Sequence, residues 1–236
     1  MYTGYEPKNK ITPHIIKDFF TKEELDEILT IVEKQKIDDS LPEFYKPQFL
    51  PQISRMQIEV LYPDKIIKKL EKFASEIVGE EVVMSHNSYL SYNKIHGDNV
   101  NPKLPPHFDA DSYYTKISFD YQLNKTIDWP IVIEDDVYNL NYGDLFIFWG
   151  AGTLHWREPV LFKDEDNTEV LTMHFSKKED YEKLNQVSRN SEEREKRLQD
   201  WVSDPKNIKH LQEYADKDSL LNKQKVVKSW NKITQH

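Results

Sequence analysis

The sequence predicts an α+β protein, in which a β-sandwich or barrel lies between an N-terminal helical region and a C-terminal helical tail. About seven or eight short segments, separated by turn residues, follow one another between residues 53 and 175, as in a sandwich or barrel. The helical patterns come before and after these segments, which argues against a parallel α/β sheet. A chain of 236 residues is most simply one domain with an appendage, and we place these at residues 1–177 and 178–236.

Two helices are expected in the N-terminal region. Thr21 and Glu24 have the spacing of a capping box, and Phe20 and Leu25 on either side fit the hydrophobic staple that often accompanies it. The apolar stripe of this first helix consists of Leu25, Ile28, Leu29 and Val32. A second helix follows residues 63 and 64, and its apolar side consists of Ile67, Leu70, Phe73, Ala74 and Ile77. Gly79 is a typical residue to end it.

The expected strands cover residues 53–61, 82–94, 114–123, 130–134, 145–149, 154–157 and 170–175, and residues 35–52 and 95–106 are expected to be loops. The strand at 114–123 has the clearest alternation. Its apolar positions are Ile117, Phe119, Tyr121 and Leu123, and its polar positions are Lys116, Ser118, Asp120 and Gln122. Successive side chains of a strand point to opposite faces, so this strand has one apolar and one polar face. The polar face either lines a cavity or faces water.

The tail from residue 178 to residue 236 consists mostly of helix-forming residues. Residues 190–193 (Asn-Ser-Glu-Glu) resemble an N-terminal cap, and residues 204–205 (Asp-Pro) interrupt the helical pattern. We expect the tail to pack on the sheet, and a homodimer or partner surface formed by its helices is the second interpretation.

Composition and charge exclude several classes of protein. A net charge of −9 and a pI of about 5.4 disfavour nucleic-acid binding, which usually needs a basic face. The chain has no Cys, which excludes disulfides and fits a reducing compartment. The N-terminus lacks the apolar run of a signal peptide, and no apolar run is long enough to span a bilayer. We therefore expect a cytoplasmic protein without a membrane segment.

The residues with the most chemical information are His107, Asp109 and His155. Two imidazoles and one carboxylate form the facial triad that holds Fe(II) and leaves coordination positions open. In an extended segment His107 and Asp109 point to the same face. One His-x-Asp is unsurprising in a chain with 8 His and 41 acidic residues. The surrounding sequence therefore decides whether these residues are interpreted as a metal site. A structural zinc site is disfavoured, because no fourth ligand such as Cys lies nearby.

The context resembles the Fe(II)- and 2-oxoglutarate-dependent oxygenases, particularly their prolyl-hydroxylase-like branch. The similarity extends over about residues 11–176 and rests on four segments in the family's order. These are residues 11–33, residues 104–109 (Leu-Pro-Pro-His-Phe-Asp), residues 121–124 (Tyr-Gln-Leu-Asn) and residues 142–148 (Tyr-Gly-Asp-Leu-Phe-Ile-Phe). The resemblance implies a double-stranded β-helix, a jelly-roll-like barrel, in which helices cover the outside of the main sheet and the polar face of residues 114–123 lines the cavity.

The resemblance also implies residues that contact 2-oxoglutarate. Most members carry the anchoring Arg on the strand after the distal His, but residues 168–175 contain neither Arg nor Lys. A subset carries His-Trp-Arg-Glu at the distal ligand, as residues 155–158 do here, so Arg157 is the candidate anchor and Lys116 the competing one. The alternative for Arg157 is a surface pair with Glu158 or Asp164. Tyr92 and Gln122 are further candidate contacts.

The implied activity is hydroxylation of a prolyl, peptidyl or amino-acid-like substrate, with decarboxylation of 2-oxoglutarate to succinate. The implied cofactors are Fe(II), 2-oxoglutarate and O2, with ascorbate as an additional one. Two other functions remain open. A cupin-type dioxygenase would use the same metal ligands without 2-oxoglutarate, and a non-catalytic β-barrel binding module would keep only the fold.

Overall fold

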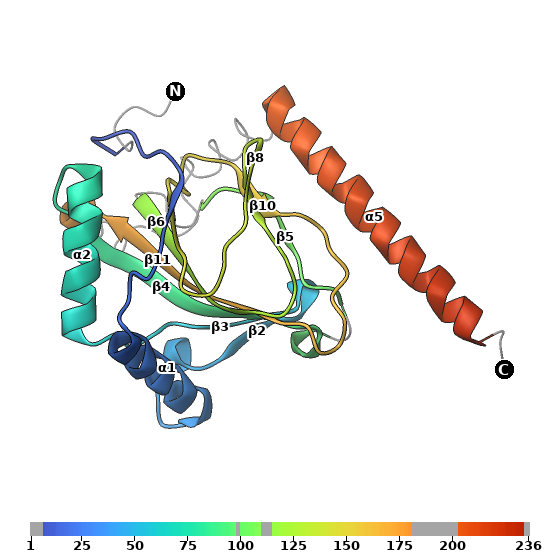
Figure 1. Cartoon of the computed structure of the whole chain (residues 1–236), viewed down its shortest axis with the longest axis horizontal. Coiled ribbons are helices and arrows are strands. Elements are labelled where there is room, and N and C mark those ends of the chain that lie inside the picture. The colour runs from blue at the N-terminus through green and yellow to red at the C-terminus, as the bar shows by residue number, and fades with distance from the viewer. Residues whose placement is uncertain (1–6, 98–99, 110–114, 181–202, 234–236) are drawn as a thin grey trace.

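The computed structural model describes residues 7–97, 100–109, 115–180 and 203–233. Two antiparallel sheets face each other in it (Figure 1). The larger sheet has the strand order β1-β9-β6-β11-β4-β3-β2, and the smaller one has the order β5-β10-β7-β8. The strands are β1 (His14–Ile16), β2 (Gln48–Leu50), β3 (Arg55–Ile58), β4 (Val83–Tyr92), β5 (Leu104–His107), β6 (Thr115–Lys125), β7 (Ile131–Ile133), β8 (Asp136–Tyr138), β9 (Leu145–Phe148), β10 (His155–Arg157) and β11 (Thr168–Ser176). The predicted jelly-roll-like α+β fold is confirmed.

Helices α1 (Lys22–Ile37) and α2 (Asp64–Val78) lie against the outside of the larger sheet (Figure 1). The predicted capping box is present, because the Thr21 side chain accepts from the Glu24 N–H and the Glu24 carboxylate accepts from the Thr21 N–H. Gly79 ends α2 with a φ of 78°, a left-handed conformation that favours glycine. The main core between helices and sheet includes Phe20, Leu25, Ile28, Val32, Ile66, Leu70, Ala74, Leu145, Ile147, Leu171, Met173 and Phe175.

Strand β6 separates this core from the interior of the barrel. Its apolar side chains, from Ile117 to Leu123, belong to the core under the helices. The intervening Ser118, Asp120 and Gln122 are also buried, so their face does not lie in water. The polar face of β6 therefore faces the interior of the barrel, and the interpretation that it faces water is wrong. On the neighbouring strand β11, Leu171, Met173 and Phe175 face the helices in the same way.

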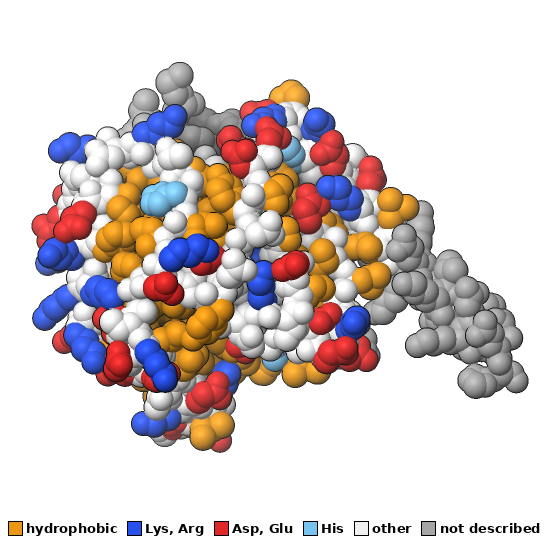
Figure 2. Space-filling view, in the orientation of Figure 1, with side chains coloured by type: hydrophobic (Ala, Val, Ile, Leu, Met, Phe, Trp, Pro, Cys, Tyr) orange, Lys and Arg blue, Asp and Glu red, His pale blue; other side chains and the backbone are white. Residues whose placement is uncertain are grey.

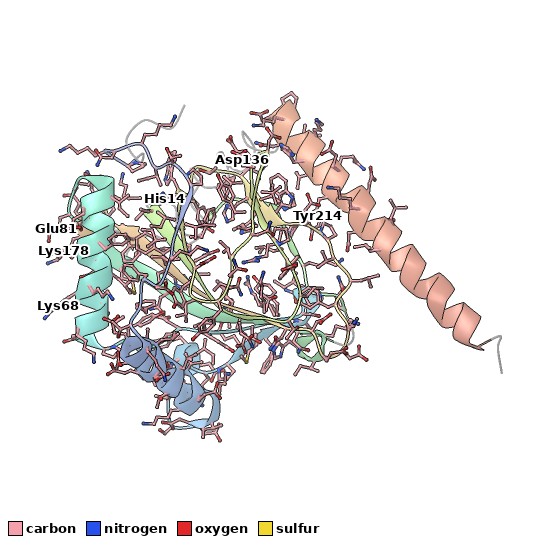
Figure 3. The ribbon with its side chains drawn as sticks, in the orientation of Figure 1. His14, Lys68, Glu81, Asp136, Lys178 and Tyr214 are labelled. Carbon is pink, nitrogen blue, oxygen red and sulfur yellow. The ribbon has the colours of Figure 1, made fainter. Side chains whose placement is uncertain are left out.

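Helix α5 (Pro205–Ile233) runs along the outside of the smaller sheet (Figure 1). It begins where residues 204–205 predicted a break, and Asp204 accepts a hydrogen bond from the Lys206 N–H at 2.8 Å. Tyr214 points from α5 toward the barrel (Figure 3) and packs with Val132, Leu154 and Trp156. The cap expected at residues 190–193 lies outside the described residues. The division at residue 177 stays a prediction, as does a dimer formed by the tail.

The prediction missed three short strands. Residues 95–106 were expected to be a loop, but β5, with the sequence Leu-Pro-Pro-His, covers the end of this segment. Residues 35–52 were expected to be a loop, but β2 lies in this segment, together with short 3-10 helices at Glu43–Tyr45 and Pro51–Ile53. Strand β8 was also not expected. β2, β5 and β8 have three or four residues each and lie at the edge of a sheet, so they are too short to produce a readable alternation.

Acidic and basic side chains are interspersed on the face drawn in Figure 2, and the described part of that face carries no broad basic patch. Among the described helices, none combines the length and the apolar character needed to cross a membrane.

Candidate metal and co-substrate site

His107, Asp109 and His155 come together inside the barrel. One ligand atom from each can be chosen so that all three lie within 4.8 Å of one another. The pairing of β5 with β10 explains why, because His107 at the end of β5 is the direct register partner of His155 at the start of β10. Asp109 follows β5 by two residues, and its Oδ1 lies 3.5 Å from Nε2 of His155. The structure thus brings together the three residues that the sequence predicted as ligands.

The backbone orients both imidazole rings. Nδ1 of His107 lies 2.9 Å from the carbonyl oxygen of Pro105, and Nδ1 of His155 lies 2.9 Å from that of Thr153. A carbonyl oxygen only accepts hydrogen bonds, so each Nδ1 carries the proton when the ring is neutral. Each Nε2 then has a free lone pair. Carbonyl contacts of this kind fix the tautomer of histidines that bind a metal.

Burial and neighbouring charges set the protonation states of the three candidate ligands, and they favour the metal-binding state at Asp109 and His107 but not at His155. Burial opposes ionisation of Asp109, but the neighbouring His174 and His155 hold the pKa of its carboxyl well below the usual range. Burial and the nearby His155 lower the pKa of His107 to about 4, so its imidazole is neutral at pH 7. Burial also lowers the pKa of His155, but attraction to the Asp109 carboxylate more than reverses this effect. Metal binding therefore competes with a proton on His155.

Two further residues contact Asp109, and the sequence did not identify them as parts of the site. The Ser118 hydroxyl donates to Oδ2 of Asp109 at 3.0 Å, and Nδ1 of His174 lies 3.5 Å from the same oxygen. Ser118 was placed on the cavity face, but its partner was not predictable. The position of His174 in the sequence does not form a recognisable motif with His107, Asp109 or His155. Its only sequence signal is its position on the inner face of the last strand, two residues after Thr172.

Arg157 is buried, with 3% of its surface exposed, and its side chain lies inside the barrel. Its guanidinium donates to the carbonyl of Trp129 and lies over the Trp129 ring, 5.3 Å from the centroid. The surface pair considered as an alternative does not form. Glu158 pairs with Lys217 at 2.8 Å, and Asp164 pairs with Lys94 at 3.1 Å.

A buried acidic residue, Asp120, lies in the interior near Arg157. Burial raises the pKa of Asp120 to about 6, although attraction to Arg157 opposes this shift. Burial likewise lowers the pKa of Arg157, against the attraction of Asp120. A ligand carboxylate that binds Arg157 would therefore lie near the acidic side chain of Asp120. The sequence motifs did not predict this proximity.

The other candidate contacts lie on strands of the larger sheet. The Tyr92 hydroxyl accepts a hydrogen bond from Arg55 at 3.4 Å, and its ring packs edge-on against Trp129. The Gln122 amide donates to the backbone carbonyls of Asn124 and Glu169 at 2.7 and 3.0 Å. Lys116 is buried at the start of β6, two residues before Ser118. The roles of Tyr92, Gln122 and Lys116 toward 2-oxoglutarate stay predictions.

Comparison with solved structures supports the fold. No protein-family model matches the sequence, and no curated protein matches it. Similar structures include the non-heme alpha ketoglutarate dependent epimerase SnoN from nogalamycin biosynthesis, with a TM-score of 0.52 and 10% identity over 70% of this chain and 77% of that one. The carbocyclase SnoK from the same biosynthesis has a TM-score of 0.53 and 8% identity, over 70% and 79% of the two chains. EctD from S. alaskensis has a TM-score of 0.52 and 10% identity, over 70% and 72%. At these identities the likeness shows a shared fold.

Proposed function

We propose that this chain is an Fe(II)- and 2-oxoglutarate-dependent dioxygenase that hydroxylates its substrate. One observation carries the proposal: His107, Asp109 and His155 converge, and the contacts of both Nδ1 atoms with the carbonyls of Pro105 and Thr153 leave Nε2 of each ring free to bind a metal. Two imidazoles and one carboxylate suit ferrous iron. Among the residues that the structure describes, this group has no fourth ligand, which leaves positions for co-substrate and oxygen. Bound iron would supply the oxidative chemistry, in which 2-oxoglutarate is decarboxylated to succinate.

The protein's own contribution is to hold these ligands in a buried interior and to bind 2-oxoglutarate. We assign the distal carboxylate of 2-oxoglutarate to Arg157, because its planar guanidinium is buried inside the barrel on the same strand as His155. Lys116 is the competing anchor. Tyr92 and Gln122 would line the same pocket, in addition to the contacts that they already make within the barrel.

For the substrate we propose a prolyl, peptidyl or amino-acid-like molecule, on the basis of the motifs in residues 104–109 and 121–124. The similar structures named above include an epimerase and a carbocyclase, so the shared fold does not decide between substrates. The loop at residues 110–114, which we expect at the entrance, lies outside the described residues. Use of O2 and ascorbate belongs to this proposal as well.

An anaerobic titration tests the assignment. Fe(II) is added to the apo protein, then 2-oxoglutarate, and the visible spectrum is recorded. Chelation of ferrous iron by the keto acid gives a weak charge-transfer band, which we expect in the wild type and not in His155→Ala. Arg157→Ala should need at least tenfold more 2-oxoglutarate for the same band, and Lys116→Ala should not, which is the matched comparison of the two anchors.

The other outcomes favour the alternative functions. Iron binding without the band, at any concentration of 2-oxoglutarate, would favour a cupin-type dioxygenase. Failure to bind Fe(II) or Mn(II) would contradict the proposal and favour a non-catalytic barrel.

A further inference from the structure

The two carboxylate oxygens of Asp109 have different neighbours. Oδ1 lies 3.5 Å from Nε2 of His155, on the side where the ligand atoms converge. Oδ2 accepts the hydrogen bond from Ser118 at 3.0 Å and lies 3.5 Å from Nδ1 of His174. One oxygen therefore faces the other ligands, and the second one faces two polar side chains of the larger sheet.

Ser118 and His174 form a cross-strand pair. They are direct register partners on β6 and β11, and the Ser118 Oγ lies 3.1 Å from Nδ1 of His174. The Ser118 hydroxyl has a single proton, and the carboxylate of Asp109 can only accept. That proton therefore goes to Asp109, and the Ser118 oxygen accepts from His174. This order of donors requires that Nδ1 of His174 carries a hydrogen.

The pair is buried and packed against a further histidine. Ser118 is fully buried and His174 is 8% exposed. On the side of β4, the His86 ring stacks on the His174 ring with centroids 5.8 Å apart and an interplanar angle of 22°. His174 is not part of the group of ligand atoms that converge, so its contact with the site passes through Asp109.

We propose that Ser118 and His174 are positioning residues that occupy Oδ2 of Asp109, so that this carboxylate presents only Oδ1 to the metal. The inference rests on the metal site of the proposed function. Partners in the second coordination sphere that orient a ligand typically contribute about 10- to 100-fold to metal affinity. Loss of the pair leaves the carboxylate free to rotate, and metal affinity falls although all three ligands are present.

The test is a titration of the apo protein with Mn(II), which needs neither 2-oxoglutarate nor turnover. Free Mn(II) is measured by its electron paramagnetic resonance signal. Ser118→Ala and His174→Gln should bind Mn(II) about 10- to 100-fold more weakly than the wild type. His174→Asn should bind within about threefold of the wild type, because the Asn amide places an N–H donor near the position of Nδ1, whereas Gln places it near Nε2. Thr172→Val, on the same strand and face, is the matched control and should bind as the wild type does.

Melting of each apo variant by circular dichroism separates loss of metal affinity from loss of folding. If Ser118→Ala does not fold, the comparison of His174→Gln with His174→Asn decides alone. Wild-type affinity in both Ser118→Ala and His174→Gln would overturn the inference and leave the proposed function intact. Equal losses in His174→Gln and His174→Asn would overturn the role of the Nδ1 donor. No Mn(II) binding by the wild type would overturn both the inference and the metal site.

Discussion

Gly150 and Asp109 share a space that admits no additional atom. The Asp109 N–H donates to the Gly150 carbonyl at 2.9 Å, and a Cβ on Gly150 would lie 1.8 Å from Oδ2 of Asp109. It would also lie 2.6 Å from the Ser118 hydroxyl. Separations below 3.0 Å are not tolerated without movement of one of the groups. The carboxylate therefore depends on a glycine in the turn that leads from β9 to β10.

Gly150→Ala should displace the Asp109 carboxylate and weaken Mn(II) binding at least tenfold. The measurement is the dissociation constant from calorimetric titration of the apo protein. Gly152→Ala is the matched control, because the three atoms nearest to its Cβ would all belong to the Trp149 ring. Unchanged affinity in Gly150→Ala, with the fold intact, would contradict the geometry described for the carboxylate.

Asp120→Asn should change how stability depends on pH. Burial raises the pKa of Asp120 from 3.8 to about 6, so the folded state favours the neutral form. The stability that this neutral form provides is present below pH 4 and is lost as the pH rises through about 6. A shift of this size corresponds to about 2–3 kcal/mol. The melting temperature of the variant should exceed that of the wild type above pH 7 and approach it near pH 4. A constant difference between the two proteins from pH 4 to pH 8 would disprove the shift.

The same substitution should strengthen binding of 2-oxoglutarate. In the wild type above pH 7, the Asp120 carboxylate repels a dicarboxylate that approaches Arg157. We expect Asp120→Asn to bind 2-oxoglutarate about tenfold more tightly at pH 8, with a smaller gain at pH 6, where half of the wild-type carboxyls are already neutral. The charge-transfer titration measures this affinity. Weaker binding by the variant would show that Asp120 supports Arg157 and does not compete for it.

Tyr214→Ser should loosen α5 from the smaller sheet. Tyr214 is 7% exposed and packs on Val132 and Trp156, so its truncation removes about 2–3 kcal/mol of buried contact. Hydrogen exchange of the amides in residues 205–221 should accelerate, while exchange in β6 and β11 stays slow. Leu220→Ser is the matched control, because Leu220 is 58% exposed. Equal exchange in the two variants would mean that Tyr214 does not hold the helix.

The sequence predicted those features that depend on local periodicity or on paired motifs. The alternation in residues 114–123 correctly predicted which side chains of β6 face the helices and which do not. The capping box at Thr21 correctly predicted where α1 begins. The convergence of His107 and His155 followed from a familiar order of motifs and is realised by their direct pairing across two strands. The contact of His174 with Asp109 was not predictable, because it depends on the register between β6 and β11, which pairs His174 with Ser118. The proximity of Asp120 to Arg157 likewise depends on how the two sheets face each other.

Along β6, positions that pack against the helices alternate with positions that face the interior of the barrel, so substitutions at the two sets have different effects. Replacing Ile117 or Phe119 would change how firmly the sheet holds its helices, whereas replacing Ser118 or Asp120 would change the chemistry of the interior. A backbone of this kind can exchange one set of interior groups for another while the packing under α1 and α2 is inherited unchanged. New specificities can therefore arise on this strand without a new fold, one alternate residue at a time.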